Sequence, residues 1–219
     1  MIEIKNLSKK FGDLTVLDNV SLKAEGVLGI CGDSGSGKST LLSVIAGVIP
    51  ATEGQILINE KKLPEDPFAL SKAVGYLVQG SPIFSELTVS QFLTFIGEAK
   101  KIPAQKLFRQ IDEVIELTEL TRVKDVYITH LPLSDRKIIG IAQTLLGNPK
   151  VVVLDEPFSD LDAGAISTMK AIIKMLGEIK TVVISSKSPS VISSICDNIV
   201  VLSNGRILGE DNATNKEGE

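Results

Sequence analysis

The 219-residue sequence has only two cysteines, Cys31 and Cys196, and a single histidine, His130. Two cysteines cannot form the disulfide framework of a small secreted domain, and they fit a chain that stays in a reducing compartment. Nothing in the sequence pairs with His130 as a catalytic dyad, so we interpret it as a loop residue. Because no run approaches about 18 uninterrupted apolar residues, the chain is not predicted to span a membrane by itself.

Basic residues are also not in excess, since 23 Lys and Arg face 27 Asp and Glu for a net charge of −4. This balance argues against a general nucleic-acid binder, which usually shows a basic excess or stripe. The few arginines argue against a small-molecule kinase, which needs arginines that bind the phosphates of its substrates. The composition, with 43% hydrophobic and 23% charged residues, is that of an ordinary globular protein.

Short apolar runs rich in β-branched residues alternate with helical patterns along most of the chain. The strand candidates are residues 28–31, 74–78, 151–154 and 181–185. All but 74–78 are apolar throughout or nearly so, which is typical of parallel strands buried on both faces. Because strands alternate with helices, the sequence predicts an α/β fold with a mainly parallel sheet and right-handed crossovers.

Two regions depart from that alternation, and a separate turn signal lies near the end of the chain. Residues 2–22 and 55–59 alternate apolar and polar side chains, which predicts antiparallel strands with one solvated face. Residues 86–130 have only helical patterns, so we expect a helical lobe inserted into the α/β core. Asn204-Gly205 lies between two apolar runs and predicts a tight hairpin, because a type I′ turn needs two residues with positive φ.

A glycine-rich segment follows the strand candidate 28–31, and it matches the phosphate-loop pattern G-x-x-x-x-G-K-[ST]. Its glycines let the backbone curl so that successive N–H groups face phosphate oxygens at the start of a helix. Lys38 supplies positive charge for the β- and γ-phosphates, and the Ser39 hydroxyl can ligate Mg²⁺. The nucleotide contacts predicted from this pattern are Gly32, Asp33, Ser34, Gly35, Ser36, Gly37, Lys38, Ser39 and Thr40.

A pair of acids, Asp155 and Glu156, ends the strand candidate 151–154. Ligands of open α/β sheets bind at this carboxyl edge of the strands. We therefore expect Asp155 to hold Mg²⁺ through water, opposite Ser39, and Glu156 to accept a proton from an attacking water.

The order of these motifs resembles the nucleotide-binding subunits of ATP-binding cassette (ABC) transporters, over about residues 2–210. The resemblance implies that Phe11 stacks on adenine. It also implies that Gln79 touches Mg²⁺ and water and links to a membrane subunit. Residues 159–162 take the place of the family's loop that crosses a dimer interface. Residues 74–79 and 86–89 look like the branch that serves exporters.

The chain departs from this family at the signature sequence, usually Leu-Ser-Gly-Gly-Gln, which contacts the γ-phosphate held by a partner subunit. Residues 131–135 stand there as Leu-Pro-Leu-Ser-Asp. Leu133 and Ser134 are larger than glycine, and Asp135 places a negative charge near the anion, which opposes binding. Ser134 remains a candidate helix cap, and a segment that only caps its helix is the alternative interpretation.

The second departure is Lys187, which stands where the family usually has histidine. A lysine donates hydrogen bonds and accepts none, so Lys187 can hold a γ-phosphate by charge without helping to orient water as an acceptor. An exposed lysine at a strand end is the alternative. Because the phosphate loop is complete, we expect this chain to bind ATP. Because of the two departures, we expect this chain alone to hydrolyse ATP slowly.

The predicted architecture is therefore a single P-loop NTPase domain over residues 1–219. Its catalytic core and N-terminal antiparallel β subdomain occupy residues 1–85 and 132–210. An inserted helical subdomain spans 86–131, and a polar tail spans 211–219.

The predicted function is that of an ATP-hydrolysing subunit that uses ATP and Mg²⁺ to drive a transporter, in the direction of export. The catalytic candidates are Glu156, Gln79, Lys38 and Lys187, and the metal-ligand candidates are Ser39, Gln79 and Asp155. The resemblance implies a second nucleotide-binding subunit, identical or different, and separate membrane subunits, but no nucleic acid. It implies a cytoplasmic location, peripheral on the inner face of the cell membrane. The alternative is a nucleotide-gated regulatory module with little or no hydrolysis.

Overall fold

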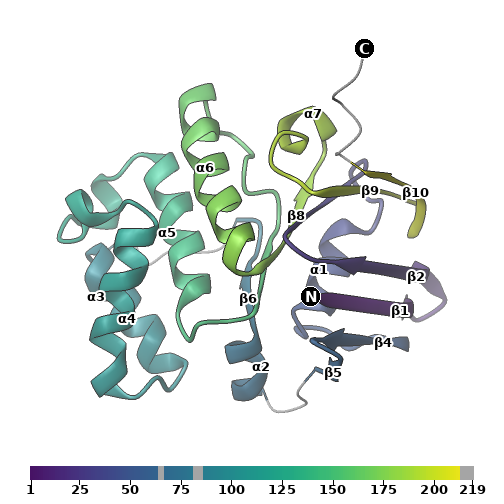
Figure 1. Cartoon of the computed structure of the whole chain (residues 1–219), viewed down its shortest axis with the longest axis horizontal. Helices are drawn as coiled ribbons and strands as arrows, with labels where there is room; N and C mark the ends of the chain where they lie inside the picture. Colours follow the sequence, from purple (N-terminus) through teal and green to yellow (C-terminus); the bar gives the residue numbers. More distant parts are fainter. Residues whose placement is uncertain (64–66, 81–85, 213–219) are drawn as a thin grey trace.

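The computed structural model describes residues 1–63, 67–80 and 86–212, and it contains two β-sheets with helices packed around them (Figure 1). The N-terminal sheet is antiparallel, with strand order β2-β1-β4-β5. Its strands are β1 (Ile2–Phe11), β2 (Leu14–Ala24), β4 (Glu53–Ile58) and β5 (Lys61–Lys62). The antiparallel sheet predicted from the alternating pattern is thus confirmed.

The second sheet has strand order β10-β9-β3-β8-β7-β6. The neighbours from β9 through β3, β8 and β7 to β6 run parallel, and only β10 pairs antiparallel. Every residue of β3, β7 and β8 is buried, because both faces of the sheet are covered. The bounds are β3 (Val27–Cys31), β6 (Val74–Leu77), β7 (Val151–Leu154), β8 (Thr181–Ser186), β9 (Asn198–Ser203) and β10 (Arg206–Asn212).

Helices cover both faces of this second sheet. The bounds are α1 (Lys38–Ile45), α2 (Pro67–Ala73), α3 (Val89–Ala99), α4 (Ala104–Leu117), α5 (Leu133–Leu145), α6 (Ala163–Ile179) and α7 (Pro189–Ile192). In Figure 1, α3, α4 and α5 gather on the side of the molecule opposite the antiparallel sheet. Helices α3 and α4 lie within residues 86–131, the predicted helical subdomain, and α5 begins after it. Two short 3₁₀ turns, Thr121–Val123 and Ile128–His130, join α4 to α5.

The hydrophobic core has two parts, one on each face of the parallel sheet. Alternate strand residues such as Val152 and Leu154 pack with the helical lobe and α6. The intervening residues, such as Val151 and Val153, pack with α1 and the antiparallel sheet. This division follows from the period-two alternation of a strand, which sends neighbouring side chains to opposite faces.

The C-terminal hairpin forms where Asn204-Gly205 predicted it, with φ of 48° and 75° at the two turn residues. The expected tail from residue 211 needs correction, because β10 continues to Asn212 through its pairing with β9. Residues 213–219 lie outside the described residues. No helix among the described residues is long and apolar enough to cross a membrane.

Candidate nucleotide-binding site

Strand register brings the predicted site residues to one edge of the parallel sheet. Leu77 pairs with Leu154, Leu154 with Ile184, and Cys31 with Ser186. The segments that follow these strands therefore meet at the carboxyl edge. They are the glycine-rich loop after β3, Gln79 after β6, the acid pair after β7 and Lys187 after β8.

The glycine-rich loop has a backbone that only glycine adopts readily. Gly35 and Gly37 have φ of 83° and 104°, and Gly37 is the N-cap of α1. A Cβ on Gly32 would lie 2.2 Å from the carbonyl oxygen of Leu202, so the loop also needs glycine for close packing. The N-terminal N–H groups of α1 start at Lys38 and give this loop the positive end of a helix dipole.

Lys38 lies at the centre of the site and is 6% exposed. Its Nζ donates to the carbonyl oxygens of Gly32 (2.7 Å) and Asp33 (2.9 Å) and lies 3.8 Å from Glu156 Oε1. Glu156 Oε1 and Ser36 Oγ are buried and have no hydrogen-bond partner among the described residues. Buried polar atoms are almost always paired, so these two atoms, of which Glu156 Oε1 lies 3.8 Å from the Lys38 ammonium, fit a polar ligand such as a phosphate with its water.

Asp155 is held by a serine that sequence reasoning did not find. The carboxylate is 2% exposed, and its Oδ1 accepts a hydrogen bond from Ser185 Oγ at 2.6 Å. Ser185 Oγ in turn accepts the backbone N–H of Glu156 at 2.7 Å. The sequence did contain a signal for this role of Ser185. Ser185 is a polar residue at the end of an apolar strand, and that strand lies next to the strand that the acids follow.

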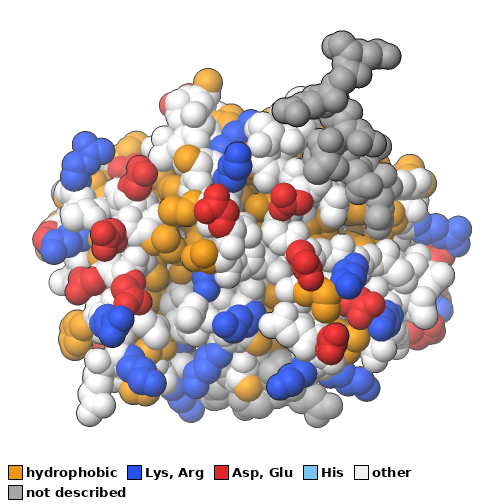
Figure 2. Space-filling model, in the orientation of Figure 1, with side chains coloured by type: hydrophobic (Ala, Val, Ile, Leu, Met, Phe, Trp, Pro, Cys, Tyr) orange, Lys and Arg blue, Asp and Glu red, His pale blue; other side chains and the backbone are white. Residues whose placement is uncertain are grey.

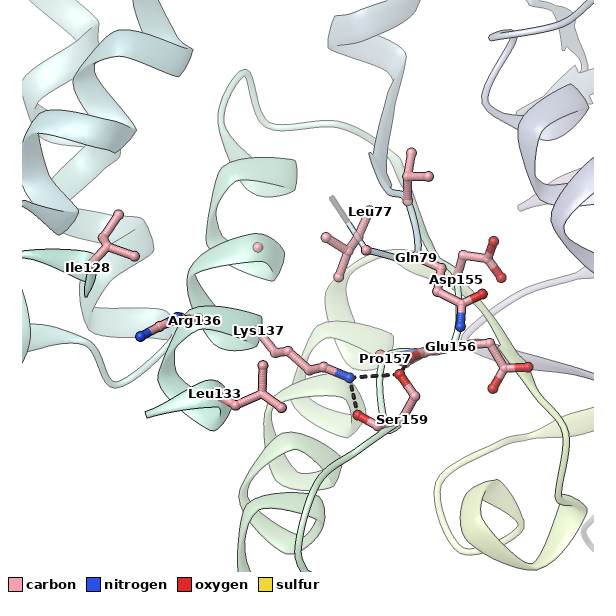
Figure 3. Close-up of a pocket in the computed structure, with 13 residues that line it drawn as sticks. Leu77, Gln79, Ile128, Leu133, Arg136, Lys137, Asp155, Glu156, Pro157 and Ser159 are labelled. Atoms are coloured by element: carbon pink, nitrogen blue, oxygen red, sulfur yellow. Dashed lines mark hydrogen bonds between the residues drawn. The ribbon is translucent and has the colours of Figure 1, made fainter. Parts of the chain in front are cut away.

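Gln79, Asp155 and Glu156 lie together beside a pocket of about 250 Å³ (Figure 3). Lys137 reaches into the same pocket from α5. Glu156 has a φ of 49°, a left-handed conformation that an L-residue keeps only when its surroundings fix it. The pocket lining also includes Leu77, Val78, Gly80, Ile128, Leu133, Arg136, Gly140, Pro157 and Ser159. The left-handed residue thus places the proposed base at the edge shared by this pocket and the phosphate loop.

Other predicted residues are exposed at the surface of this region. Ser39, Gln79 and Lys187 are exposed, and Thr40 is half-buried. Phe11, at the end of β1, is 49% exposed, and Lys9 Nζ lies 4.8 Å from its ring centroid in a cation–π contact. The nucleotide contacts and stacking assigned to these residues stay predictions.

The prediction that Ser134 caps its helix is wrong. Helix α5 begins at Leu133, and its N-cap is Pro132, which makes no side-chain cap hydrogen bond. The fixed φ of Pro132, −63°, and the bond from Arg136 N to the Pro132 carbonyl close the first turn before Ser134 reaches a cap position. Asp135 lies in that first turn and offsets the positive end of the helix with its own charge.

Both thiols are free and buried. Burial raises the pKa of Cys31 to about 11, although the Lys38 charge acts in the opposite direction and the Glu156 carboxylate adds to the rise. Burial likewise raises the pKa of Cys196 to about 12. Burial and a raised pKa both disfavour the thiolate at neutral pH, so packing is the role that the structure supports for these two side chains.

A phosphate loop between a strand and a helix, with an acid pair after another parallel strand of the same sheet, defines a P-loop nucleotide-binding domain. The family model described as "ABC transporter" matches residues 17–159. The chain therefore belongs to the ABC transporter family, and the order of its motifs makes it an ATP-binding domain of that family.

Two curated relatives illustrate the similarity. The sulfate/thiosulfate import ATP-binding protein CysA of Synechocystis is 34% identical over 94% of this chain and 59% of its own length. The methionine import ATP-binding protein MetN 3 of Shouchella clausii is 33% identical over 95% of this chain and 64% of its own length. The chain thus spans about three fifths of the length of these relatives.

Solved structures show the same fold over almost the whole chain. CbiO1 from Clostridium perfringens, described as part of an ABC transporter complex, superposes with a TM-score of 0.87 at 26% identity, covering 97% of this chain and 88% of the other. The bacterial ABC transporter cassette MJ0796, solved as a dimer, gives a TM-score of 0.82 at 27% identity over the full length of both chains.

Proposed function

We propose that this chain binds Mg²⁺-ATP and hydrolyses it as the ATP-binding subunit of a transporter. The observation that carries the proposal is the distance of 3.8 Å between Lys38 Nζ and Glu156 Oε1, which come from segments that follow two different strands at one edge of the sheet. A phosphate on the loop would therefore lie next to the carboxylate proposed as the base. Family membership and the unpartnered Glu156 oxygen support this assignment.

In this proposal each residue has one task. The loop N–H groups and Lys38 would hold the phosphates, and Ser39, Asp155 and Gln79 would hold Mg²⁺. Bound Mg²⁺ would neutralise charge on the phosphate oxygens. Ser185 keeps the Asp155 carboxylate oriented, and Glu156 accepts the proton of the attacking water.

The altered helix start points to a second cassette as a partner. Pro132 has no N–H, Leu133 is 47% exposed, and Asp135 adds negative charge, so this end of α5 is a poor contact for a phosphate. We propose that a partner cassette with an intact signature closes over the phosphate loop of this chain. The dimeric structure of MJ0796 supports cassette pairing in general. Lys187 would contact the γ-phosphate by charge alone.

The proposed partners also include separate membrane subunits, which would place this chain on the inner face of the cell membrane. Export, the direction favoured by the sequence, stays a prediction, because CysA and MetN 3 are named as import proteins. On the face shown in Figure 2, basic side chains gather along the lower edge and acidic side chains lie above them, so the absence of a nucleic-acid partner stays a prediction from the net charge.

The experiment compares wild type with Lys38→Ala and Glu156→Gln for Mg²⁺-ATP binding and for phosphate release. We expect wild type and Glu156→Gln to bind ATP, Lys38→Ala to bind it weakly, and only wild type to release phosphate. Slow release is expected for this chain alone. If wild type and Glu156→Gln bind ATP equally and neither hydrolyses it, with or without a partner cassette, the chain is instead a nucleotide-gated regulatory module. The altered start of α5 favours that second function.

A further inference from the structure

Lys137 connects α5 to the loop that follows Glu156. It lies one turn into α5, half-buried, and its side chain extends across the pocket toward Ser159 (Figure 3). Its Nζ donates to the carbonyl oxygen of Ser159 and, at 2.8 Å, to the Ser159 hydroxyl oxygen. One ammonium thus binds two oxygens of a single residue, which fixes the distance between helix and loop.

Ser159 is also hydrogen-bonded to the backbone of Glu156, so it links Lys137 to Glu156. Its Oγ donates to the Glu156 carbonyl oxygen at 3.1 Å, and its N–H donates to the same oxygen at 3.2 Å. The turn between them is bounded by two left-handed residues, Glu156 (φ 49°) and Asp160 (φ 60°). Such conformations persist only where surrounding contacts hold them, and Lys137 provides contacts from another element.

The charges around Lys137 favour a protonated ammonium at this position. Burial lowers the pKa of Lys137, and the carboxylates of Asp160 and Glu156 oppose that shift. An ammonium that loses water here and gains two oxygen acceptors makes charge-assisted hydrogen bonds, which are stronger and more directional than neutral ones.

We propose that Lys137 is a positioning residue that fixes the Glu156 turn to α5 through Ser159. The base and the start of α5, where the altered signature lies, then move as one unit. Lys137 itself contacts neither the phosphates nor the base carboxylate in this scheme, and it acts only through the Ser159 relay. Its effect on hydrolysis rests on the proposed function, whereas its effect on the turn does not.

The first test measures kcat and ATP affinity for Lys137→Met and Lys137→Arg in the full chain, assayed with any partner cassette that hydrolysis needs. We expect Lys137→Met to lower kcat about 10- to 100-fold, the range for losing a charge-assisted contact that orients a catalytic group, with ATP affinity changed less than about twofold. Arginine can donate to both Ser159 oxygens and should restore most of kcat. The matched control is Lys170→Met, because Lys170 Nζ also donates to a serine hydroxyl, that of Ser194 at 3.2 Å, on an exposed surface.

The second test needs no hydrolysis. Hydrogen exchange of a peptide covering residues 155–162 should be at least about tenfold faster in Lys137→Met than in wild type or Lys170→Met, because the Ser159 N–H bond to Glu156 opens locally. A melting temperature for each variant shows whether it is folded. If Lys137→Met does not fold, the same comparison is made with Lys137→Gln, which keeps one donor group.

The two tests separate this inference from the proposed function. Wild type that binds ATP but never hydrolyses it refutes the proposed hydrolysis, and the exchange result then decides the role of Lys137. Unchanged exchange in a folded Lys137 variant overturns the inference. So does a normal kcat, or a loss of ATP affinity that accounts for the whole effect.

Discussion

Ser185 provides the sharpest test of how the metal-binding edge is built. Ser185 is fully buried near the end of β8, beside the end of β7. Its hydroxyl donates to Asp155 Oδ1 at 2.6 Å and accepts Glu156 N–H at 2.7 Å, so it holds both acids with one oxygen. Ser185→Ala removes both bonds while adding no bulk.

The expected cost follows from these two bonds. A hydrogen bond to a charged group contributes about 1.5–3 kcal/mol, and a buried N–H left unpaired costs about 1–3 kcal/mol. A water from the neighbouring pocket can recover part of this, so we expect the free energy of unfolding to fall by about 3 kcal/mol. This is a large part of the total of about 5–15 kcal/mol for a typical domain.

The assay is urea unfolding followed by circular dichroism, which suits a chain without tryptophan. Ser186→Ala is the matched control, because among the described residues its hydroxyl bonds only to the nearby Ser188 backbone, at 3.0 and 3.2 Å. We also expect Ser185→Ala to need more Mg²⁺ for half-maximal ATP binding, since Asp155 is no longer oriented. A Ser185→Ala loss no larger than that of Ser186→Ala would refute the reasoning.

Three further predictions test the packing around the site. Burial lowers the pKa of Lys100 to about 8, so between pH 8 and its unfolded pKa the unfolded chain binds more protons. Wild-type stability relative to Lys100→Met should then rise with pH, by at most about 3 kcal/mol, and a flat or falling difference in urea unfolding would contradict this. Because burial raises the pKa of Cys31 and Cys196, iodoacetamide at pH 8 should label the native chain slowly and the urea-unfolded chain fully by mass spectrometry; equal rates would argue against this. Thr88→Ala removes the capping box with Gln91 and should cost about 1 kcal/mol in urea unfolding, and no measurable cost would show that the cap is dispensable.

The sequence predicted the elements whose signals are local. The apolar runs 151–154 and 181–185 became buried parallel strands, and Asn204-Gly205 became a hairpin turn, because each depends on side chains a few residues apart. The phosphate loop was equally clear, since G-x-x-x-x-G-K-[ST] restricts both backbone and side chains.

The missed features depend on contacts between segments far apart in the sequence. Ser185 matters because β8 lies beside β7, and Lys137 matters because α5 passes the loop after β7. No spacing along the chain indicates either contact. The cap of α5 was misassigned for a local reason, because serine is a common N-cap but Pro132 had already fixed the entry into the helix.

The two surfaces that we propose face nucleotide, the phosphate loop and the start of α5, are unequal in this chain. The loop side keeps its glycines, Lys38 and both acids, whereas the start of α5 has a proline in place of a donor and Asp135 in its first turn. One such charge about 5 Å from a phosphate opposes it by about 3 kcal/mol before solvent and salt reduce the effect. In a dimer of two identical copies, each phosphate loop would face a start of α5 that binds phosphate poorly. A partner cassette with an intact signature would contact the phosphate bound on the loop of this chain. The contacts of Lys137 with Ser159 would then keep Glu156 in position next to that phosphate.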